Sequence, residues 1–270
     1  MIVQKKNNKM LLFDHLSGCS NISHFMTTCQ GGVSKEEYAS FNLGEFAGDN
    51  PENVLQNREI LAAELGLSLE QLIFPYQIHQ DKVLRVDEAL INLSPDSRKE
   101  AMSGYDALVT NLPNVCIGVT TADCVPLLAF DPRKCVLAAV HAGWRGTVAC
   151  IVLKTIDVMC REYGCLPENI LFGIGAAISV DKFEVGEEVV AEFQKASIDL
   201  MSASYRHPKT GKCHIDLQLV NRNLLLEAGI PDKNIEIMPL CTQSRADLFF
   251  SARRQGVKSG RMVTGGFIRE

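Results

Sequence analysis

Two short apolar runs mark the middle of the chain, and polar side chains follow each of them. The runs cover residues 115–120 and 135–140 and are rich in Val and Ala, which is typical of strands buried on both faces. The Asp131-Pro132 pair between them favours a turn. Asp123 and Cys124 follow the first run. We therefore predict two buried strands joined by a turn, with reactive side chains at their ends.

Apolar positions spaced three and four residues apart predict helices elsewhere. The first is expected at residues 51–66, where Pro51 supplies the first turn and Gly66 the end. By helical spacing, one face of this helix is shared by Val54, Arg58, Leu61 and Leu65. Further helices are predicted from Arg145 to about residue 164, at 184–196 and at 217–228.

Strand-like runs alternate irregularly with these helices. They are predicted at residues 22–28, 73–86, 170–174, 235–238 and 262–268, whereas the polar stretch 90–103 is expected to be a surface excursion. The chain shows no internal repeat and no clear linker. This order predicts an α/β or α+β fold with a mixed sheet, in a single domain spanning residues 1–270.

Composition narrows the class of protein. The chain has 270 residues, of which 46% are hydrophobic and 22% charged, as in ordinary globular proteins. No apolar run is long enough to cross a membrane, and the N-terminus MIVQKKNNKM has no apolar segment of a secretory signal. A net charge of −5 argues against nucleic acid as a partner. Ten cysteines without a CxxC pair predict reduced thiols in the cytoplasm.

Four reactive side chains cluster around the central strands. Asp123 and Cys124 follow the first strand, His141 follows the second, and Arg145 opens the next helix. A lone cysteine is more often an inert core residue, but this grouping favours a functional site. Arg145 and the helix N-terminus favour an anion such as phosphate. Asp123 is either a general acid or base, or a residue that orients a ligand.

The same residues carry a resemblance to a known family. TADCVPLLAFDP (121–132) and VHAGWRGT (140–147) resemble the laccase-domain family, whose members are regarded as purine nucleoside phosphorylases. Flanking segments agree in order: GGVS, SFNLG, GDNPENVLQNRE, QIHQDKV, FEVGEEV, HIDL, CT at 241, FFSARR and SGR. The match extends from about His24 to Arg261.

The resemblance implies a metal site. By position, the zinc ligands of the family are His79, Cys124 and His141 in this chain. Three protein ligands with a fourth position open are the catalytic pattern for zinc. Copper is the alternative metal, because older descriptions treat these proteins as copper-dependent polyphenol oxidases.

The resemblance also implies a fold and an activity. The fold is a four-layered α/β/β/α arrangement, in a monomer or homodimer. The implied reaction splits adenosine, inosine or methylthioadenosine with phosphate into free base and ribose 1-phosphate, and adenosine deamination is a second activity. The implied partners are a purine nucleoside and phosphate. Asn42 and Arg58, in matching segments, are candidate substrate-binding or scaffold residues.

The chain departs from the family pattern at one position that bears on phosphate. Cys29 stands where the family often has an arginine before the glycine pair. An arginine that could hold phosphate is therefore missing, and we expect phosphate affinity to be affected. Cys241 lies in a matching segment, which makes it a further candidate for the site.

Two other interpretations use the same residues. Cys124 as nucleophile and His141 as base would make a metal-free cysteine hydrolase or deamidase. A copper oxidase of the multicopper type needs many paired histidines, whereas this chain has six scattered ones without an HxH motif. A binding module without catalysis fits least well, because an open three-ligand site has little purpose there.

Overall fold

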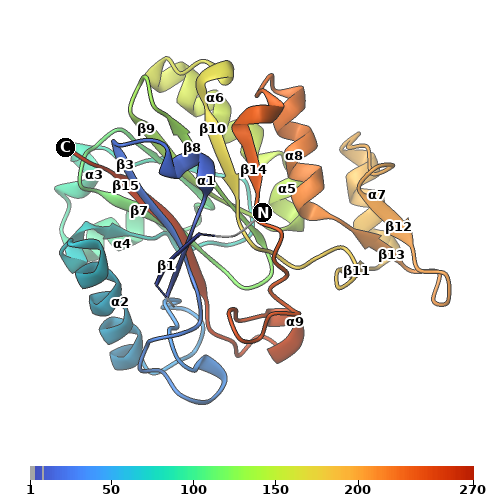
Figure 1. The fold of residues 1–270 in the computed structure, drawn as a ribbon, viewed down its shortest axis with the longest axis horizontal. Helices are drawn as coiled ribbons and strands as arrows, with labels where there is room; N and C mark the ends of the chain where they lie inside the picture. Colours follow the sequence, from blue (N-terminus) through green and yellow to red (C-terminus); the bar gives the residue numbers. More distant parts are fainter. Residues whose placement is uncertain (1–3, 8) are drawn as a thin grey trace.

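Two stacked mixed sheets form the centre of the computed structural model, which describes residues 4–7 and 9–270 (Figure 1). The first contains, in spatial order, β1 (Gln4–Asn7), β2 (Met10–Leu12), β3 (Ile22–Thr27), β15 (Met262–Ile268), β7 (Cys116–Thr121) and β4 (Leu72–Ile73). The second contains β14 (Ile235–Ile237), β10 (Leu171–Ile174), β8 (Val125–Asp131), β9 (Val136–Ala142), β6 (Ala107–Thr110) and β5 (Val83–Arg85). The pairs β4–β7, β5–β6 and β10–β14 are parallel.

Side-chain alternation along the strands separates the core into layers. In β8, Val125, Leu127 and Ala129 belong to one hydrophobic cluster, whereas Leu128 and Phe130 belong to another. Successive side chains of a strand point to opposite faces of the sheet. The cluster that holds Leu128 and Phe130 also holds residues of β7 and β15, so it lies between the two sheets. Burial of both faces explains why these strands are apolar throughout.

Helices cover the outer faces of both sheets. α5 (Trp144–Val148), α6 (Ile151–Tyr163) and α8 (Leu217–Glu227) pack over the second sheet. α2 (Pro51–Leu65) covers the first, where Leu61 joins a cluster with Phe25 and Val263. The order helix, sheet, sheet, helix confirms the four-layered α/β/β/α arrangement. The other helices are α1 (Asp14–Ser17), α3 (Glu88–Ile91), α4 (Pro95–Ala101), α7 (Glu187–Lys195) and α9 (Ala252–Gln255).

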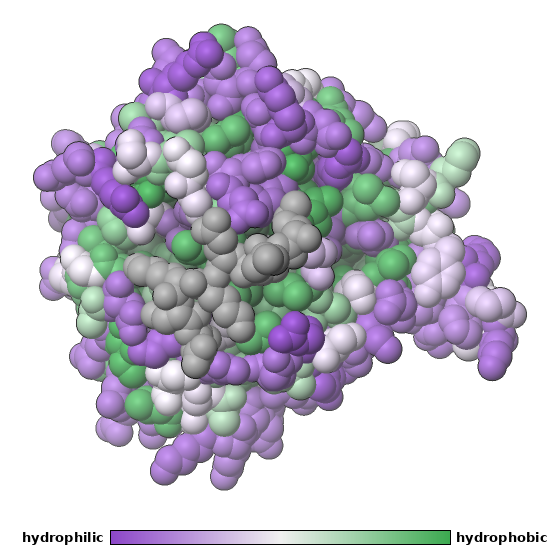
Figure 2. Space-filling model, viewed as in Figure 1, coloured by the Kyte–Doolittle hydropathy of each residue, from purple (hydrophilic) through white to green (hydrophobic). Residues whose placement is uncertain are grey.

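A small third sheet projects from the side of this core. It consists of β11 (Glu184–Val185), β13 (Cys213–Ile215) and β12 (Ser204–Arg206), and α7 lies beside it at the right of Figure 1. On the face drawn in Figure 2, hydrophilic side chains dominate the outline and interrupt the hydrophobic groups. No helix in the described part of the chain is long and apolar enough to cross a bilayer. The stretch in which no secretory signal was expected includes residues 1–3 and 8, which lie outside the described residues.

The central stretch differs from its prediction in a way that matters for the site. It forms three strands, because residues 125–131 are themselves β8 and pair with β9 in antiparallel register. β7 belongs to the other sheet. The chain crosses from one sheet to the next at residues 122–124, where Asp123 takes the left-handed conformation with φ 90°. The reactive residues of this stretch therefore lie at a crossover between sheets.

Four other predictions need correction. The strand expected at 73–86 exists only at its two ends, β4 and β5, and an irregular loop joins them. The polar stretch 90–103 contains α4, which the Ser94 side chain caps by accepting from the Ser97 N–H. The helix after Arg145 is divided into α5 and α6 at Cys150, whose φ is 57°. The helix expected at 184–196 begins only at Glu187, because residues 184–185 are β11.

The remaining elements agree with the pattern. α2, α8, β3, β10, β14 and β15 lie within one or two residues of their predicted ranges. On α6, Val152, Ile156 and Met159 are buried at helical spacing, so one face of this helix lies against the core.

Candidate metal and substrate site

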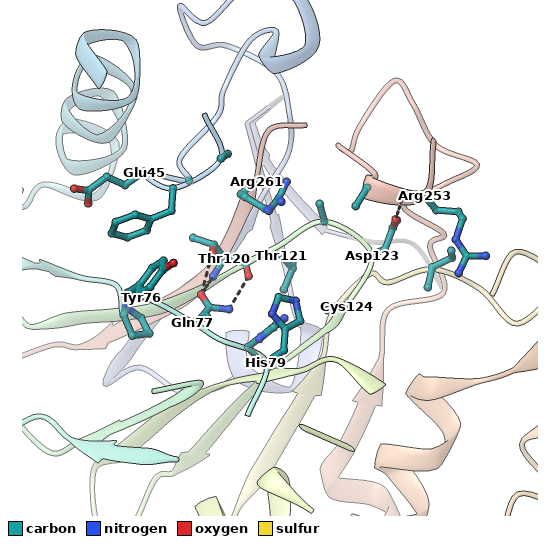
Figure 3. A pocket seen from close by; sticks show the side chains of 18 of the residues that line it. Glu45, Tyr76, Gln77, His79, Thr120, Thr121, Asp123, Cys124, Arg253 and Arg261 are labelled. Carbon is teal, nitrogen blue, oxygen red and sulfur yellow. Dashed lines mark hydrogen bonds between the residues drawn. The ribbon is translucent and has the colours of Figure 1, made fainter. Parts of the chain in front are cut away.

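Three potential metal ligands from separate segments meet at the crossover. His79 lies in the loop after β4, Cys124 lies between β7 and β8, and His141 lies near the end of β9. The ligand atoms of all three lie within 4.8 Å of one another. The β8–β9 register pairs Val125 with Ala142, which brings Cys124 beside the end of β9. Figure 3 shows His79 and Cys124 among the side chains that line a pocket, and His141 lines the same pocket.

Asp106 holds two of these ligands in place. Its fully buried carboxylate accepts from His141 Nδ1 at 2.7 Å, which leaves Nε2 as the free ring nitrogen of His141. The same carboxylate accepts backbone N–H groups from Ile78, His79 and Gln80 at 2.9–3.2 Å. A carboxylate behind a ligating histidine fixes the tautomer and orientation of the ring. Asp106 therefore orients His141 and anchors the loop that carries His79.

Gln77 anchors the same loop to the first sheet. Its Oε1 accepts the Thr120 N–H at 2.7 Å and the Thr120 hydroxyl at 2.8 Å, and its Nε2 donates to the Thr120 carbonyl at 2.9 Å (Figure 3). These bonds tie the His79 loop to the end of β7, immediately before the crossover.

Cys124 and His141 lie close enough to shift each other's pKa. Burial disfavours the Cys124 thiolate, but the charges and hydrogen bonds of His141 and His79 outweigh it and lower the pKa of Cys124 to about 6. Burial disfavours the His141 imidazolium, yet Cys124 and Asp106 raise the pKa of His141 to about 9. Two imidazoles and a thiolate are a donor set that suits Zn²⁺ and other soft divalent metals. The residues present therefore fit a metal ion.

Gly143 leaves room for this cluster. A Cβ at Gly143 would lie 3.1 Å from Cys124 Sγ and 3.3 Å from His79 Cδ2, tighter than ordinary contacts. Its φ of −67° suits any residue, so a larger side chain would act through crowding alone. We expect Gly143→Ala to weaken metal binding by about tenfold while the protein stays folded, because ligand displacements of tenths of an ångström distort coordination.

The matched control for this prediction is Gly18→Ala, where the new Cβ would lie 3.5 Å from the His15 carbonyl oxygen, an ordinary contact distance. Chelator competition on both variants measures metal affinity. Equal affinity in Gly143→Ala and Gly18→Ala would contradict the close packing inferred for the site.

A pocket of about 560 Å³ opens above the cluster. Volumes of this size hold small-molecule ligands. At one end Phe46 and Tyr76 form an aromatic pair, with ring centroids 4.2 Å apart. The lining residues are Gly44, Glu45, Phe46, Ala47, Arg58, Pro75, Tyr76, Gln77, His79, Thr120, Thr121, Ala122, Asp123, Cys124, His141, Ile178, Phe183, Ala252, Arg253 and Arg261.

Asp123 lines the pocket, but its carboxylate is occupied by the protein. Oδ1 accepts from the Thr242 hydroxyl at 2.6 Å. Oδ2 accepts from the Ser251 hydroxyl at 2.9 Å and from the Arg253 N–H at 2.7 Å. These three bonds tie the crossover to the C-terminal segment around α9. Of the two roles left open for Asp123, this geometry favours positioning.

The structure does not bring Arg145 to the pocket. Its side chain is exposed, and its guanidinium stacks over the Trp144 ring at 4.2 Å. Residue 145 is the second residue of the short helix α5, and it is not among the residues that line the cavity. The expectation that Arg145 binds phosphate beside His141 therefore has no support in this geometry.

Asn42 and Arg58 have scaffold contacts. Asn42 is fully buried, and its Oδ1 accepts backbone N–H groups from Gly44 and Arg261 at 3.0 and 2.9 Å. Arg58 lines the pocket, but Nε and Nη2 both donate to the Leu43 carbonyl at 3.3 Å. Both residues shape the loop that forms one wall.

The two cysteines singled out from the sequence lie outside the lining of the pocket. Cys29 is buried, and its sulfur faces the carbonyls of Ala246 and Asp247 at 3.9 Å. The Cys241 sulfur accepts the Ser179 N–H at 3.3 Å. Cys241 also forms an isolated β-bridge with Ala177.

The sequence interpretation missed Arg261, Phe46 and Tyr76. Arg261 belongs to SGR, one of the segments that match the family, but the sequence interpretation assigned no role to this arginine. The aromatic pair joins two loops far apart in sequence, and residue spacing carries no sign of that contact.

A thiol and two imidazoles, with a buried carboxylate behind one of them, line a pocket where the chain crosses between two stacked sheets. This chain is therefore an α/β protein with a candidate metal site. The chain belongs to the family described as multi-copper polyphenol oxidoreductase laccase, whose model matches residues 23–269. This confirms the resemblance found in its motifs.

Characterised relatives extend over nearly the whole chain. It is 44% identical over 270 residues, the full length of both proteins, to a purine nucleoside phosphorylase of Bacteroides thetaiotaomicron. It is 41% identical to adenosine deaminase RL5 of an unknown prokaryotic organism, covering 93% of this chain and 96% of that protein. The crystal structure of YlmD from Geobacillus stearothermophilus superposes with a TM-score of 0.90 at 30% identity, covering 100% and 99% of the two chains.

Proposed function

We propose that this protein is a zinc-dependent purine nucleoside phosphorylase. The observation that carries the proposal is the His79, Cys124 and His141 cluster at the floor of a 560 Å³ pocket, in a chain related end to end to a protein of that name. The substrates would be adenosine, inosine or methylthioadenosine together with phosphate. The family relationship supports an enzyme rather than a binding module.

Zinc is the metal that the donor set favours. His79, Cys124 and His141 would hold it with a further coordination position open. When bound, zinc supplies a positive charge that polarises an oxygen ligand and activates it. Copper is the alternative suggested by the family description. Multicopper oxidation needs several copper centres, and residues 4–7 and 9–270 hold one cluster of this kind.

The chain's own residues bind and orient the reactants. Phe46 and Tyr76 offer apolar ring surface at which a purine base can stack. In phosphorolysis an oxygen of HPO₄²⁻ bonds to the anomeric carbon while the bond from that carbon to the purine nitrogen breaks. The electron pair and the phosphate proton end on the purine, which leaves as the free base. Holding the two reactants in one pocket lowers the barrier by proximity.

The positioning residues complete this assignment. We assign Asp123 to holding the C-terminal segment against the crossover, because its oxygens are satisfied by three protein donors. We assign Asn42 and Arg58 to shaping the pocket wall. Arg145 has no role in the proposed reaction, since its exposed guanidinium stacks on Trp144.

Adenosine deamination is a second candidate activity. The observation that favours it is the 41% identity to a protein named adenosine deaminase. Water would add to the purine carbon that bears the amino group. One proton of that water would move to the amino group, which leaves as ammonia, and the other would stay on the inosine that forms. The same pocket serves both reactions, and only phosphorolysis consumes phosphate.

The reactivity of Cys124 distinguishes a metal-free cysteine hydrolase from the phosphorylase and the deaminase. A thiolate bound to zinc is shielded from alkylation, whereas a free nucleophilic thiolate with a pKa near 6 reacts readily. Iodoacetamide labelling before and after chelation therefore discriminates between the two. Rapid labelling of Cys124 in the zinc-loaded, active protein would favour the hydrolase.

The unpaired state of all ten cysteines supports a reducing compartment, and we propose the cytoplasm.

The function itself is tested with inosine. Hypoxanthine release by the zinc-loaded protein should require inorganic phosphate and should consume it in equal amount. Release of hypoxanthine at the same rate without phosphate would replace the phosphorylase by a hydrolase.

A further inference from the structure

Three arginines line the pocket, and they differ in which donors remain available. Arg58 has its Nε and Nη2 on the Leu43 carbonyl and its Nη1 on Glu45. Arg253 is exposed, and its Nη1 donates to the carbonyls of Lys182 and Glu184.

Arg261 is arranged differently. All three of its side-chain hydrogen bonds are made by Nη1, to Ser259 O at 2.6 Å, Ser259 Oγ at 2.9 Å and Gly260 O at 3.0 Å. The edge formed by Nε and Nη2 makes no hydrogen bond within the described residues. This edge is the one with which a guanidinium holds phosphate in a bidentate fork.

The fold fixes Arg261 in this orientation. Its backbone N–H donates to Asn42 Oδ1 at 2.9 Å, and Gly44 packs so closely that a Cβ there would lie 2.6 Å from Arg261 Cγ. Burial lowers the pKa of Arg261, and the nearby Cys124 and Asp123 charges oppose that effect. A rigid, partly desolvated guanidinium with no carboxylate partner in the described part of the chain is suited to bind an anion.

A second, independent feature lies next to Arg261. Thr121 is 1% exposed, and its Oγ1 has no hydrogen-bond partner among residues 4–7 and 9–270 although the residue lines the pocket. The β7–β15 register pairs Thr121 with Met262, so Thr121 adjoins Arg261 across the sheet (Figure 3). Buried hydroxyls are normally satisfied, and an unsatisfied one facing a cavity indicates a missing ligand.

We propose that Arg261 and Thr121 form the phosphate subsite, with Asn42 and the Ser259-Gly260 segment as positioning residues. This inference rests on the proposed phosphorolysis. A nucleoside carries no anionic group, so the free fork and the free hydroxyl match the co-substrate rather than the sugar or base. The subsite lies beside Cys124. Arg261 supplies an arginine for phosphate, although Cys29 stands where the family often has one.

The test separates phosphate from nucleoside binding. Arg261→Met should raise the KM for phosphate by about 100-fold and Arg261→Lys by about tenfold, because a charge-assisted fork contributes about 1.5–3 kcal/mol, which converts to this range. Thr121→Val should raise it by about fivefold. The KM for inosine and the zinc content should change far less. Arg269→Lys, an exposed arginine remote in the sheet from the pocket, is the matched control.

Calorimetric titration of the zinc-loaded protein with inorganic phosphate gives a readout without turnover. Wild type should bind phosphate, and Arg261→Met should lose most of that affinity. A phosphate affinity and KM within twofold of wild type in Arg261→Met would overturn the inference. So would an equal loss of adenosine deamination, which needs no phosphate. If wild type binds phosphate but performs no phosphorolysis, the proposed function fails while the subsite stands.

Discussion

Replacing His79 with asparagine is expected to abolish stable zinc binding and to lower turnover by at least about 1,000-fold. Two remaining ligands cannot hold zinc as three do. Asparagine is chosen because residue 79 has φ 61°, a left-handed conformation that asparagine tolerates better than alanine. The variant should therefore fold like the parent protein. Metal content per chain is measured by elemental analysis. Turnover is measured with adenosine and phosphate as substrates.

His15→Asn is the matched control for this result. His15 is exposed in the short helix α1, so its replacement should leave about one zinc per chain and full activity. Full zinc content and activity in His79→Asn would remove His79 from the metal site.

Changing Asp106 is expected to damage both the fold and the metal site. Asp106→Ala removes the acceptor of four hydrogen bonds and leaves buried donors without a partner. Loss of one partner from a buried charged pair costs about 3–5 kcal/mol of the free energy of unfolding. Asp106→Asn keeps the shape and should be milder. It should nevertheless weaken zinc binding by about 10- to 100-fold, because His141 loses the carboxylate that orients it.

Urea unfolding of the zinc-free protein measures the first effect, and chelator competition measures the second. Asp232→Asn is the control, because that exposed carboxylate pairs with Arg222 at the surface and should contribute less than about 1 kcal/mol. Zinc affinity equal to wild type in Asp106→Asn would show that the carboxylate does not support the ligand.

The sequence predicted those parts of the site that depend on strand ends. Cys124 and His141 each follow an apolar run, and a run buried on both faces must end where the sheet ends. His79 was found only through the resemblance, because it lies in an irregular loop with no periodic pattern. Asp106 holds that loop, and this dependence on a distant carboxylate leaves no local sequence signal.

The errors have common physical causes. Residues 125–131 were not predicted as a strand of their own, because Asp123 and Pro126 interrupt the apolar pattern close to the point where the chain crosses between sheets. Arg145 looked close to the site because it is four residues from His141, yet the helix α5 begins between them and turns the guanidinium onto Trp144. Arg261 lies in the matching segment SGR, but its place beside Thr121 follows only from the β7–β15 register, which the sequence does not show.

The most direct measurement is product analysis by mass spectrometry. The purified protein, with its metal content known, is incubated with adenosine and inorganic phosphate, with and without a zinc chelator. The predicted result is adenine and ribose 1-phosphate in equal amounts, lost with the chelator and restored by zinc. Inosine as the sole product would instead assign deamination to this pocket. Turnover unaffected by removal of the metal would contradict the role given to His79, Cys124 and His141.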